Sequence, residues 1–590
     1  MPGWSDMQRR KNNFVTELLC RKCRLTGRSE TECDFENPRE GWVFFGVQPA
    51  FAQEPAPRIS MVLANAGPVI QGPEAMRFLP AGPHRLTLSA DTAGAVTLTV
   101  RVVPELIFTR FGYNPQIAAY GPYDEAFLSQ HVLPNINCMI GKGYDEEKPF
   151  LERWKKEGKR WIVESQIPGM SDPPETVTAD RAYESWAANP GLLDAIYDGI
   201  IADEVGPNQP LQKLSAWTAA IRRLHETGRL KDKSLYAYCY YVLPSQEEGR
   251  QFVRALIDCG GRIAWERYLL EQPTEKKARE FLDKTLKQEF LEWERAVPGC
   301  RESMIFTLGC HTLMPVESLN VRPDVDWKVF MDMQMHLLAN DPAFTCIYGL
   351  QTYTCGYADE ESVRWASRLF RHYAIEGRTD MLSPRYGYTY NLDYIRNPDF
   401  DQGTDHWLIE AAEPDSVSVR HVPGYGHLQG RFLTPDVGDH CLWTRRSRDK
   451  RNVIRQEIRN LVPGRLYSFK LITADFGEIR AGRSRQQEHA ISVRMENVDL
   501  LPEKSLLEVR PSFYTFKMGP FNAENPLWLN FRHQVFRALE TSARLALSDW
   551  ESDGVAGGQV GQELVWNFIE IQPYFQDQTG HRVQLGCISG

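Results

Sequence analysis

The chain has 590 residues and a mass of 67.7 kDa, so at roughly 150 residues per domain it should hold about four domains, or fewer if one is a large α/β barrel. Its 42% hydrophobic, 11% aromatic and 25% charged residues are typical of a globular protein and exclude long disorder, collagen-like repeats and a small disulfide scaffold. The 68 Lys and Arg against 77 Asp and Glu give a net charge of -9, which disfavours nucleic acid as a partner because phosphate backbones need concentrated positive charge.

The opening residues MPGWSDMQRRKNNFVTELL lack the apolar core of a signal peptide, and no later stretch has the roughly 18 apolar residues needed for a membrane span. We therefore expect a soluble protein, either cytoplasmic or exported with its signal removed. Of the 12 cysteines, several lie in apolar runs and are interpreted as reduced packing residues. The single CxxC of Cys20 and Cys23, with Cys33 nearby, lacks a second pair at zinc-finger spacing, so we expect no metal there.

The first segment, residues 1–104, predicts a small β-sandwich. From about residue 30 it contains WVFFGV, RISMVLA, HRLTLSA and AVTLTVRVV, runs rich in β-branched and aromatic residues separated by Pro and Gly.

The middle segment, residues 105–388, predicts a (β/α)8 TIM barrel, because apolar runs alternate with amphipathic helical stretches. The strand candidates are LIFTRFG from 106, INCMIG from 136, RWIVESQ from 160, YDGIIADE from 197, SLYAYCYY from 234, RIAWERYLL from 262, MIFTLGCH from 304 and CIYGLQTY from 346. The helical stretches include EKKAREFLDKTLKQEFLEWERAV, from residue 275. The alternative is an open doubly wound sheet, but TRFGYNPQ after the first strand is neither GxGxxG nor a P-loop.

The last segment, residues 389–590, predicts a second β-sandwich, a jelly roll, because helical patterns stop near residue 390 and strand-like runs such as VSVRHV, HAISVRM, TFKM and VWNFIEIQPYF follow. The phrases NPDFDQGTDHW and QEIRNLVPGRLYSFKL resemble the opening and middle strands of carbohydrate-binding jelly-roll modules. Asp399, Asp401 and Asp405 have the hard oxygen ligands that calcium prefers, but the spacing fails the EF-hand pattern, and we interpret them as a polar loop. We expect neither a metal nor a cofactor.

Carboxylates at the ends of the predicted barrel strands are the candidate reactive groups, because barrel enzymes place their reactive groups at the carboxyl ends of the strands. Glu164 ends the third strand, Asp203 and Glu204 end the fourth, and Glu266 lies late in the sixth. Adjacent carboxylates after the apolar run Ile200–Ala202 are costly to desolvate without a compensating role. Because neighbouring residues of a strand point to opposite faces, only one of the pair needs to enter the barrel mouth.

The whole arrangement resembles multidomain bacterial glycoside hydrolases built on TIM barrels. In the large retaining clan of that kind, the acid/base Glu follows strand four and a nucleophilic Glu ends strand seven. Glu204 matches the first position. Strand seven of this chain, however, ends in Leu308–His311, which contains no carboxylate. Two alternatives remain open. Either Glu266 or Glu164 is the second carboxylate, or the mechanism is substrate-assisted, as in barrel hexosaminidases with an adjacent Asp-Glu. The chitinase-like DGxDxDxE pattern is one residue short between Asp198 and Glu204.

Aromatic and polar strand ends supply candidate substrate contacts, since sugar faces pack on flat rings while hydroxyls seek polar partners. The candidates are Tyr238, Tyr240, Tyr241 and Tyr353 for the rings, His311 and Gln351 for hydroxyls, and Arg110 for an acidic substituent. Our leading hypothesis is a glycoside hydrolase acting on an oligo- or polysaccharide, with Glu204 as general acid/base and Asp203 or Glu266 completing the site. The competing hypothesis is a noncatalytic glycan-binding or scaffold protein that retains the barrel.

Overall fold

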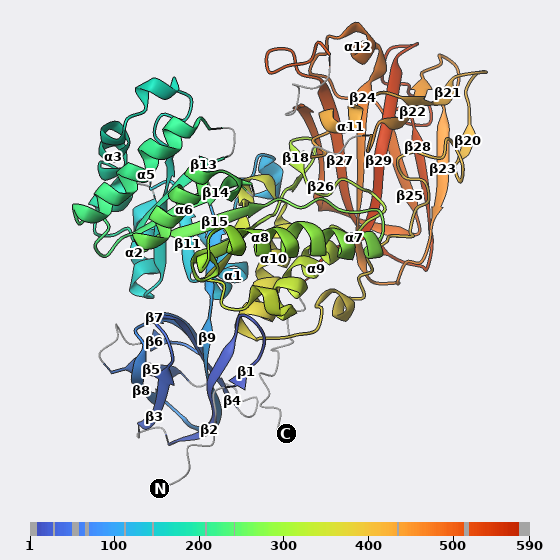
Figure 1. Cartoon of the computed structure of the whole chain (residues 1–590). Coiled ribbons are helices and arrows are strands. Elements are labelled where there is room, and N and C mark those ends of the chain that lie inside the picture. The colour runs from blue at the N-terminus through green and yellow to red at the C-terminus, as the bar shows by residue number, and fades with distance from the viewer. Residues whose placement is uncertain are drawn as a thin grey trace.

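The computed structural model describes residues 9–26, 30–49, 58–64, 70–110, 114–143, 147–206, 209–240, 242–432, 436–512 and 519–576. Strands near the N-terminus, a parallel barrel and a second set of strands follow one another along the chain (Figure 1). The predicted strand TFKM, residues 515–518, and the predicted ring Tyr241 lie outside the described residues. No helix in the described ranges is long and apolar enough to cross a membrane.

The N-terminal unit consists of two antiparallel sheets, with strand orders β1-β2-β9-β4-β7 and β3-β8-β5-β6. Side chains alternate along β4, so that Val43 and Phe45 enter the core that the two sheets share, whereas Trp42 and Phe44 join the hydrophobic cluster between the barrel strands and the elements around them. The strands are β1 Arg9–Arg10, β2 Thr16–Thr26, β3 Thr31–Asn37, β4 Gly41–Pro49, β5 Ile59–Leu63, β6 Ile70–Gln71, β7 Glu74–Leu79, β8 Gly82–Ala90 and β9 Ala93–Val103.

Eight parallel strands close into a barrel, which confirms the prediction from the alternating pattern. Strand β10 pairs with β11 on one side and with β19 on the other, and the β19 pairing closes the ring. Each of the predicted runs supplies one strand: β10 Glu105–Thr109, β11 Cys138–Gly141, β12 Arg160–Gln166, β13 Gly199–Val205, β14 Ser234–Cys239, β15 Arg262–Arg267, β16 Met304–Gly309 and β19 Gly349–Tyr353.

Amphipathic helices surround the barrel. Helix α5 is typical, because Leu214, Trp217, Ile221 and Leu224 recur at helical spacing and are all buried. The long helix predicted from residue 275 forms α7 and α8 joined by a π-helical turn, Asp283–Gln288. The helices are α1 Glu125–His131, α2 Lys148–Lys156, α3 Ala179–Ala187, α4 Pro190–Leu193, α5 Leu211–Glu226, α6 Glu247–Asp258, α7 Glu275–Leu282, α8 Glu289–Ala296, α9 Trp327–Asn340 and α10 Glu360–Leu369.

The C-terminal unit also has two antiparallel sheets, with orders β20-β23-β28-β25 and β21-β22-β29-β24-β27-β26. Residues of both sheets share one core, including Ile454 and Leu545 of the first sheet and Phe469 and Trp566 of the second. The strands are β20 Leu408–Glu410, β21 Val417–His421, β22 His440–Arg445, β23 Val453–Ile458, β24 Leu466–Asp475, β25 Ser492–Glu496, β26 Val498–Pro511, β27 Trp528–Ala538, β28 Ala543–Ser548 and β29 Glu563–Pro573.

Two short helices, α11 Tyr425–Leu428 and α12 Phe476–Ala481, interrupt this unit, so the prediction that helices stop near residue 390 was wrong at these places. Each is too short to produce a readable helical period in the sequence.

A short hairpin after β16 joins the barrel to the C-terminal unit. This mouth hairpin comprises β17 Thr312–Leu313 and β18 Glu317–Ser318. Met314 of the hairpin shares a hydrophobic cluster with Tyr425 of α11. The backbone N–H of Ser318 donates to the carbonyl of Gly430 at 2.8 Å. Because β16 ends where the hairpin begins, the C-terminal unit packs beside the carboxyl-terminal rim of the barrel strands (Figure 1).

Candidate functional site

Strand β13 breaks its regular pairing where its two carboxylates lie. Its register with β14 shifts between Ala202 and Val205, and Glu204 has a φ of 64°. Left-handed backbone at a residue other than Gly costs on the order of 1–3 kcal/mol and clusters at functional sites. The shift leaves Asp203 partly buried and Glu204 exposed. Of the two adjacent carboxylates, Asp203 is therefore the one that enters the barrel mouth more deeply.

Asp203 has a strongly raised pKa. Burial, together with the negative charges of Glu164 and Glu204, raises the pKa of Asp203 from 3.8 to about 7, while the positive charge of Lys142 acts in the opposite direction. A carboxyl group with this pKa carries a proton in a substantial fraction of molecules at neutral pH. Asp203 is thus equipped to transfer a proton.

Glu266 is a second carboxyl with a raised pKa. Burial raises the pKa of Glu266 from 4.5 to about 8, and the charges of Asp203 and Glu204 act in the same direction. The Tyr268 hydroxyl donates a 2.7 Å hydrogen bond to Oε1 of Glu266 and lowers this pKa in part. The effect of the Asp203 and Glu204 charges on Glu266 indicates that the three carboxyls lie at one rim of the barrel.

Glu164 of β12 differs from these carboxyls because it forms an ion pair with Lys142, which follows β11. The pair keeps a negative charge at the rim, and that charge is one cause of the raised pKa of Asp203. The sequence predicted Glu164 but not Lys142.

Aromatic rings cover the rim beside the carboxyls. Tyr353 lies at a ring-centroid distance of 5.4 Å from Tyr238 and stacks on Tyr268 at 5.5 Å. The charges of Asp203 and Glu266 act on both Tyr238 and Tyr353, whose pKa values are raised first by burial. Tyr240, 45% exposed, is the outermost predicted ring, and its pKa is raised by burial and by the charges of Glu266, Glu204 and Asp203.

His311 lies among these rings. Its ring centroid is 4.9 Å from that of Tyr268 and 5.4 Å from that of Tyr357. Nδ1 of His311 is 2.9 Å from Oε1 of Glu317 on the mouth hairpin. The sequence predicted His311 but gave no sign of Glu317, because a Glu in a loop after a strand carries no pattern.

Arg110 and Gln351 are the other two residues predicted to contact substrate. The Arg110 side chain is 1% exposed, and its guanidinium carbon is 5.6 Å from the Phe150 ring centroid of helix α2, so it points toward the helix layer. The Gln351 amide is inside the barrel, where Nε2 donates to Tyr238 at 2.5 Å and to Thr109 at 2.6 Å. The roles of Arg110 and Gln351 in substrate binding stay predictions.

Four residues of the site were not predicted from the sequence, and they differ in whether a sequence pattern could have indicated them. Tyr268 is two positions after Glu266, and the period of a strand puts such residues on one face, so this tyrosine was within reach of the sequence argument. Lys142 follows β11, Glu317 begins the two-residue strand β18 and Tyr357 ends a single 3-10 turn, and none of these segments is long enough to show a period.

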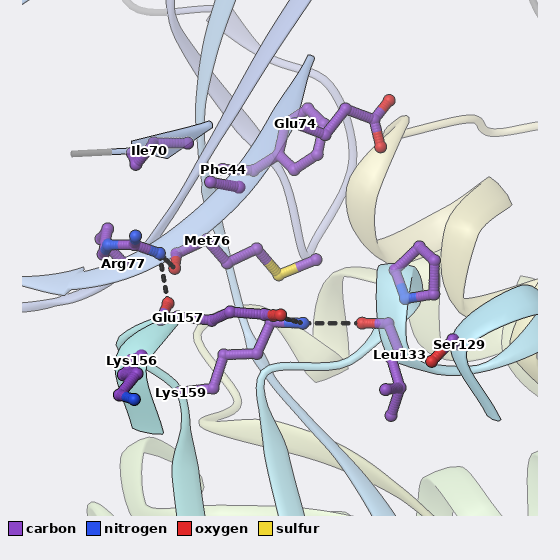
Figure 2. A pocket seen from close by; sticks show the side chains of 12 residues that line it. Phe44, Ile70, Glu74, Met76, Arg77, Ser129, Leu133, Lys156, Glu157 and Lys159 are labelled. Carbon is purple, nitrogen blue, oxygen red and sulfur yellow. Dashed lines mark hydrogen bonds and ion pairs between the residues drawn. The ribbon is translucent and has the colours of Figure 1, made fainter. Parts of the chain in front are cut away.

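A cavity of about 460 Å³ lies away from this site (Figure 2). It is lined by β4, β7 and the segment between α2 and β12, and so opens between the N-terminal unit and the amino-terminal ends of the barrel strands. Arg77 of β7 donates to the Glu157 carbonyl and so ties the N-terminal unit to the barrel, whereas Lys159 donates to the Leu133 carbonyl at 2.8 Å within the barrel segment (Figure 2).

The predicted polar loop near residue 400 is held by an ion pair. Arg431 contacts both carboxylate oxygens of Asp399, at 2.5 and 2.8 Å. Asp401 contacts His440 instead, at 3.0 Å. Within the described ranges, no group of three or more His, Cys, Asp or Glu side chains is arranged to hold a metal ion.

Comparison with known proteins gives matches by structure alone. No family model matches the chain, and no curated protein matches it. A chitinase from Chromobacterium violaceum ATCC 12472 is 10% identical and matches 45% of this chain and 97% of its own, with a TM-score of 0.30. A ruminal GH26 endo-β-1,4-mannanase is 10% identical over 59% of this chain and 88% of its own, with a TM-score of 0.28.

A third solved structure is TmCBM61 in complex with β-1,4-galactotriose, which is 12% identical and matches 31% of this chain and 98% of its own, with a TM-score of 0.17. The structures that resemble this chain thus include glycoside hydrolases and a carbohydrate-binding module. Because these TM-scores are low, the functional proposal stands on the geometry of the rim.

Proposed function

We propose that the chain is a glycoside hydrolase whose proton transfers are carried out by the carboxyls of Asp203, Glu204 and Glu266. The observation that carries this proposal is a pair of neighbouring carboxyls with pKa values raised to about 7 and about 8, beside the ion-paired Glu164. Glycoside hydrolysis needs one carboxyl that gives a proton to the leaving oxygen and a second that acts as base or nucleophile. The site combines protonated and ionised carboxyls, which is the division that this reaction requires.

The proposed roles differ in part from those that the sequence suggested. Asp203 and Glu266 are the proton donors, because their raised pKa values keep protons bound near neutral pH. The exposed Glu204 is the second carboxyl at the rim, and its charge raises the pKa of Asp203. The rings of Tyr240 and Tyr353 form the surface on which a sugar unit packs, while the fully buried Tyr238 supports Tyr353 from inside the barrel.

For the whole chain, we propose domains at 1–104, 105–388 and 389–590, with β-sandwiches on both sides of the barrel. The C-terminal sandwich is a jelly roll of the kind found in carbohydrate-binding modules. The substrate is an oligo- or polysaccharide.

The test is hydrolysis of β-1,4-linked tetrasaccharides of glucose, mannose, galactose and N-acetylglucosamine, together with larger glycans. Asp203→Asn and Glu204→Gln should each lower turnover by about a hundredfold to ten-thousandfold while leaving glycan binding nearly intact, because the amides keep shape but lose proton transfer. Asp180→Asn removes an exposed carboxylate that pairs with Arg223 on the helix layer and serves as the control. Wild type that binds these glycans without cleaving them would favour the noncatalytic alternative.

A further inference from the structure

One nitrogen at the rim has no partner. Nε2 of His311 is buried and has no hydrogen-bond partner among the described residues. The whole residue is only 2% exposed. A buried polar atom without a partner lowers stability, and a ligand that supplies the missing hydrogen bond recovers that loss.

Glu317 determines which ring nitrogen of His311 is already bonded. Its Oε1 lies 2.9 Å from Nδ1 of His311, and a carboxylate accepts hydrogen bonds, so Nδ1 carries the proton and donates it. Nε2 is then the ring nitrogen left to form a hydrogen bond with a ligand hydroxyl. Because Tyr268 and Tyr357 flank the imidazole, such a hydroxyl would belong to a molecule that also packs on flat rings.

The C-terminal unit fixes Glu317 through the neighbouring residue. Ser318 donates its N–H to Gly430 at 2.8 Å and accepts from the N–H of Phe432 at 3.0 Å. Gly430 has a φ of 79°, and a Cβ at this position would lie 2.8 Å from the backbone carbon of Pro315 in the mouth hairpin. Only a glycine therefore permits this close contact between the two backbones.

We propose that His311 and Glu317 form a hydroxyl-binding subsite for one sugar unit, in which Glu317 is a positioning residue and the C-terminal unit holds Glu317 in place. The inference rests on the proposed glycan site and adds to it the atom that recognises a hydroxyl. It also gives the C-terminal unit a part in shaping the barrel mouth, apart from any sugar binding of its own.

The first experiment observes the imidazole directly. In protein with 15N-labelled histidine, the His311 resonances, assigned with His311→Gln, should show a proton on Nδ1. The four β-1,4-linked tetrasaccharides are added one at a time to the Glu204→Gln variant. The sugar that wild type cleaves should shift the Nε2 resonance, and Glu317→Ala should abolish the preference for the Nδ1 proton while Glu317→Gln retains part of it.

The second experiment measures affinity for the same tetrasaccharide in the Glu204→Gln background. Glu317→Ala and His311→Gln should each weaken binding by about tenfold to a hundredfold, the effect expected when a buried hydrogen bond is lost. Asp401→Ala removes the carboxylate from an exposed His–Asp pair in the C-terminal unit and should leave affinity unchanged.

The third experiment tests the link to the C-terminal unit. Gly430→Ala should weaken binding because its methyl group displaces the mouth hairpin. Gly464→Ala is the matched control, since Gly464 also has a positive φ, 85°, but no atom within 4 Å of an added Cβ. Equal affinities for the two variants would overturn the proposed link.

The outcomes separate the two proposals. If wild type cleaves a tetrasaccharide whose binding leaves the His311 Nε2 resonance unshifted, the subsite is wrong and the hydrolase remains. If wild type neither binds nor cleaves any glycan tested, the proposed function fails and the subsite with it.

Discussion

Tyr268 donates a 2.7 Å hydrogen bond to Oε1 of Glu266, while Oε2 of the same carboxyl is buried without a hydrogen-bond partner among the described residues. The tyrosine holds the carboxyl in one orientation and lowers its pKa, whereas burial raises that pKa to about 8. The balance between these two effects sets the pH range in which Glu266 carries a proton.

Removing this hydrogen bond should move the pH dependence of the reaction upward. In Tyr268→Phe the pKa of Glu266 should rise, because the hydrogen bond that stabilises its ionised form is lost. The high-pH limb of kcat/KM should therefore shift to higher pH, as a pH profile on a cleaved glycan would reveal. Tyr183→Phe, which removes an exposed hydroxyl donor to Thr227, serves as the control. An unmoved limb would argue that another group titrates there.

Lys142→Met should act on Asp203 in the same direction. The positive charge of Lys142 lowers the pKa of Asp203, and removing it should raise that pKa above about 7. Lys142→Arg keeps the charge and should leave the pH profile close to that of wild type. If Lys142→Met instead moved the profile to lower pH, Asp203 would not be the group that this lysine influences.

The raised pKa of Glu266 also predicts a pH-dependent stability. The folded pKa, about 8, exceeds the reference value of 4.5, so the folded state binds more protons between these values and stability falls as pH rises through this window. Glu266→Gln removes this loss. Its free energy of unfolding should exceed that of wild type by about 1 kcal/mol or more at pH 8, and the advantage should vanish near pH 4. Denaturant titrations at both pH values would measure it, and a pH-independent difference would contradict the assigned pKa.

The buried Asp399–Arg431 pair should contribute strongly to the stability of the C-terminal unit. The Arg431 side chain is 0% exposed, so Arg431→Met leaves a buried carboxylate without its cation and should cost about 3–5 kcal/mol. The more exposed Arg455–Glu410 pair offers the contrast, because Arg455→Met should cost under about 1 kcal/mol. Urea denaturation of both variants compares the two costs; similar losses would show that burial does not decide the effect.

Much of the architecture was predictable because it depends on local periodicity. Each of the predicted runs became a strand of the closed barrel, and strand ends in a parallel barrel share one rim, so Asp203 and Glu266 were expected at the same place. The raised pKa values of these two carboxyls could not be predicted from the sequence, since desolvation depends on which residues pack around them.

For some residues the sequence pattern predicted the strand on which they lie but not the side chains that they contact. Gln351 was expected at a strand end but lies in the middle of β19, and it donates hydrogen bonds inside the barrel to Thr109 and Tyr238, which are distant in the chain. Arg110 likewise follows the first barrel strand, and only the packing of helix α2 decides that its side chain lies against Phe150.

By itself, the sequence determined the barrel and the identity of the carboxylates at its rim, because period and strand order are properties of neighbouring residues. The tertiary structure decided that Asp203 is buried more deeply than Glu204, because the register of β13 shifts at this point and no residue pattern predicts that shift. It also decided that Glu317 lies against His311, since the hairpin carrying Glu317 takes its place from Gly430 in a distant part of the chain. Such contacts form between segments far apart in sequence, and their burial and charges arise only when the whole chain is folded.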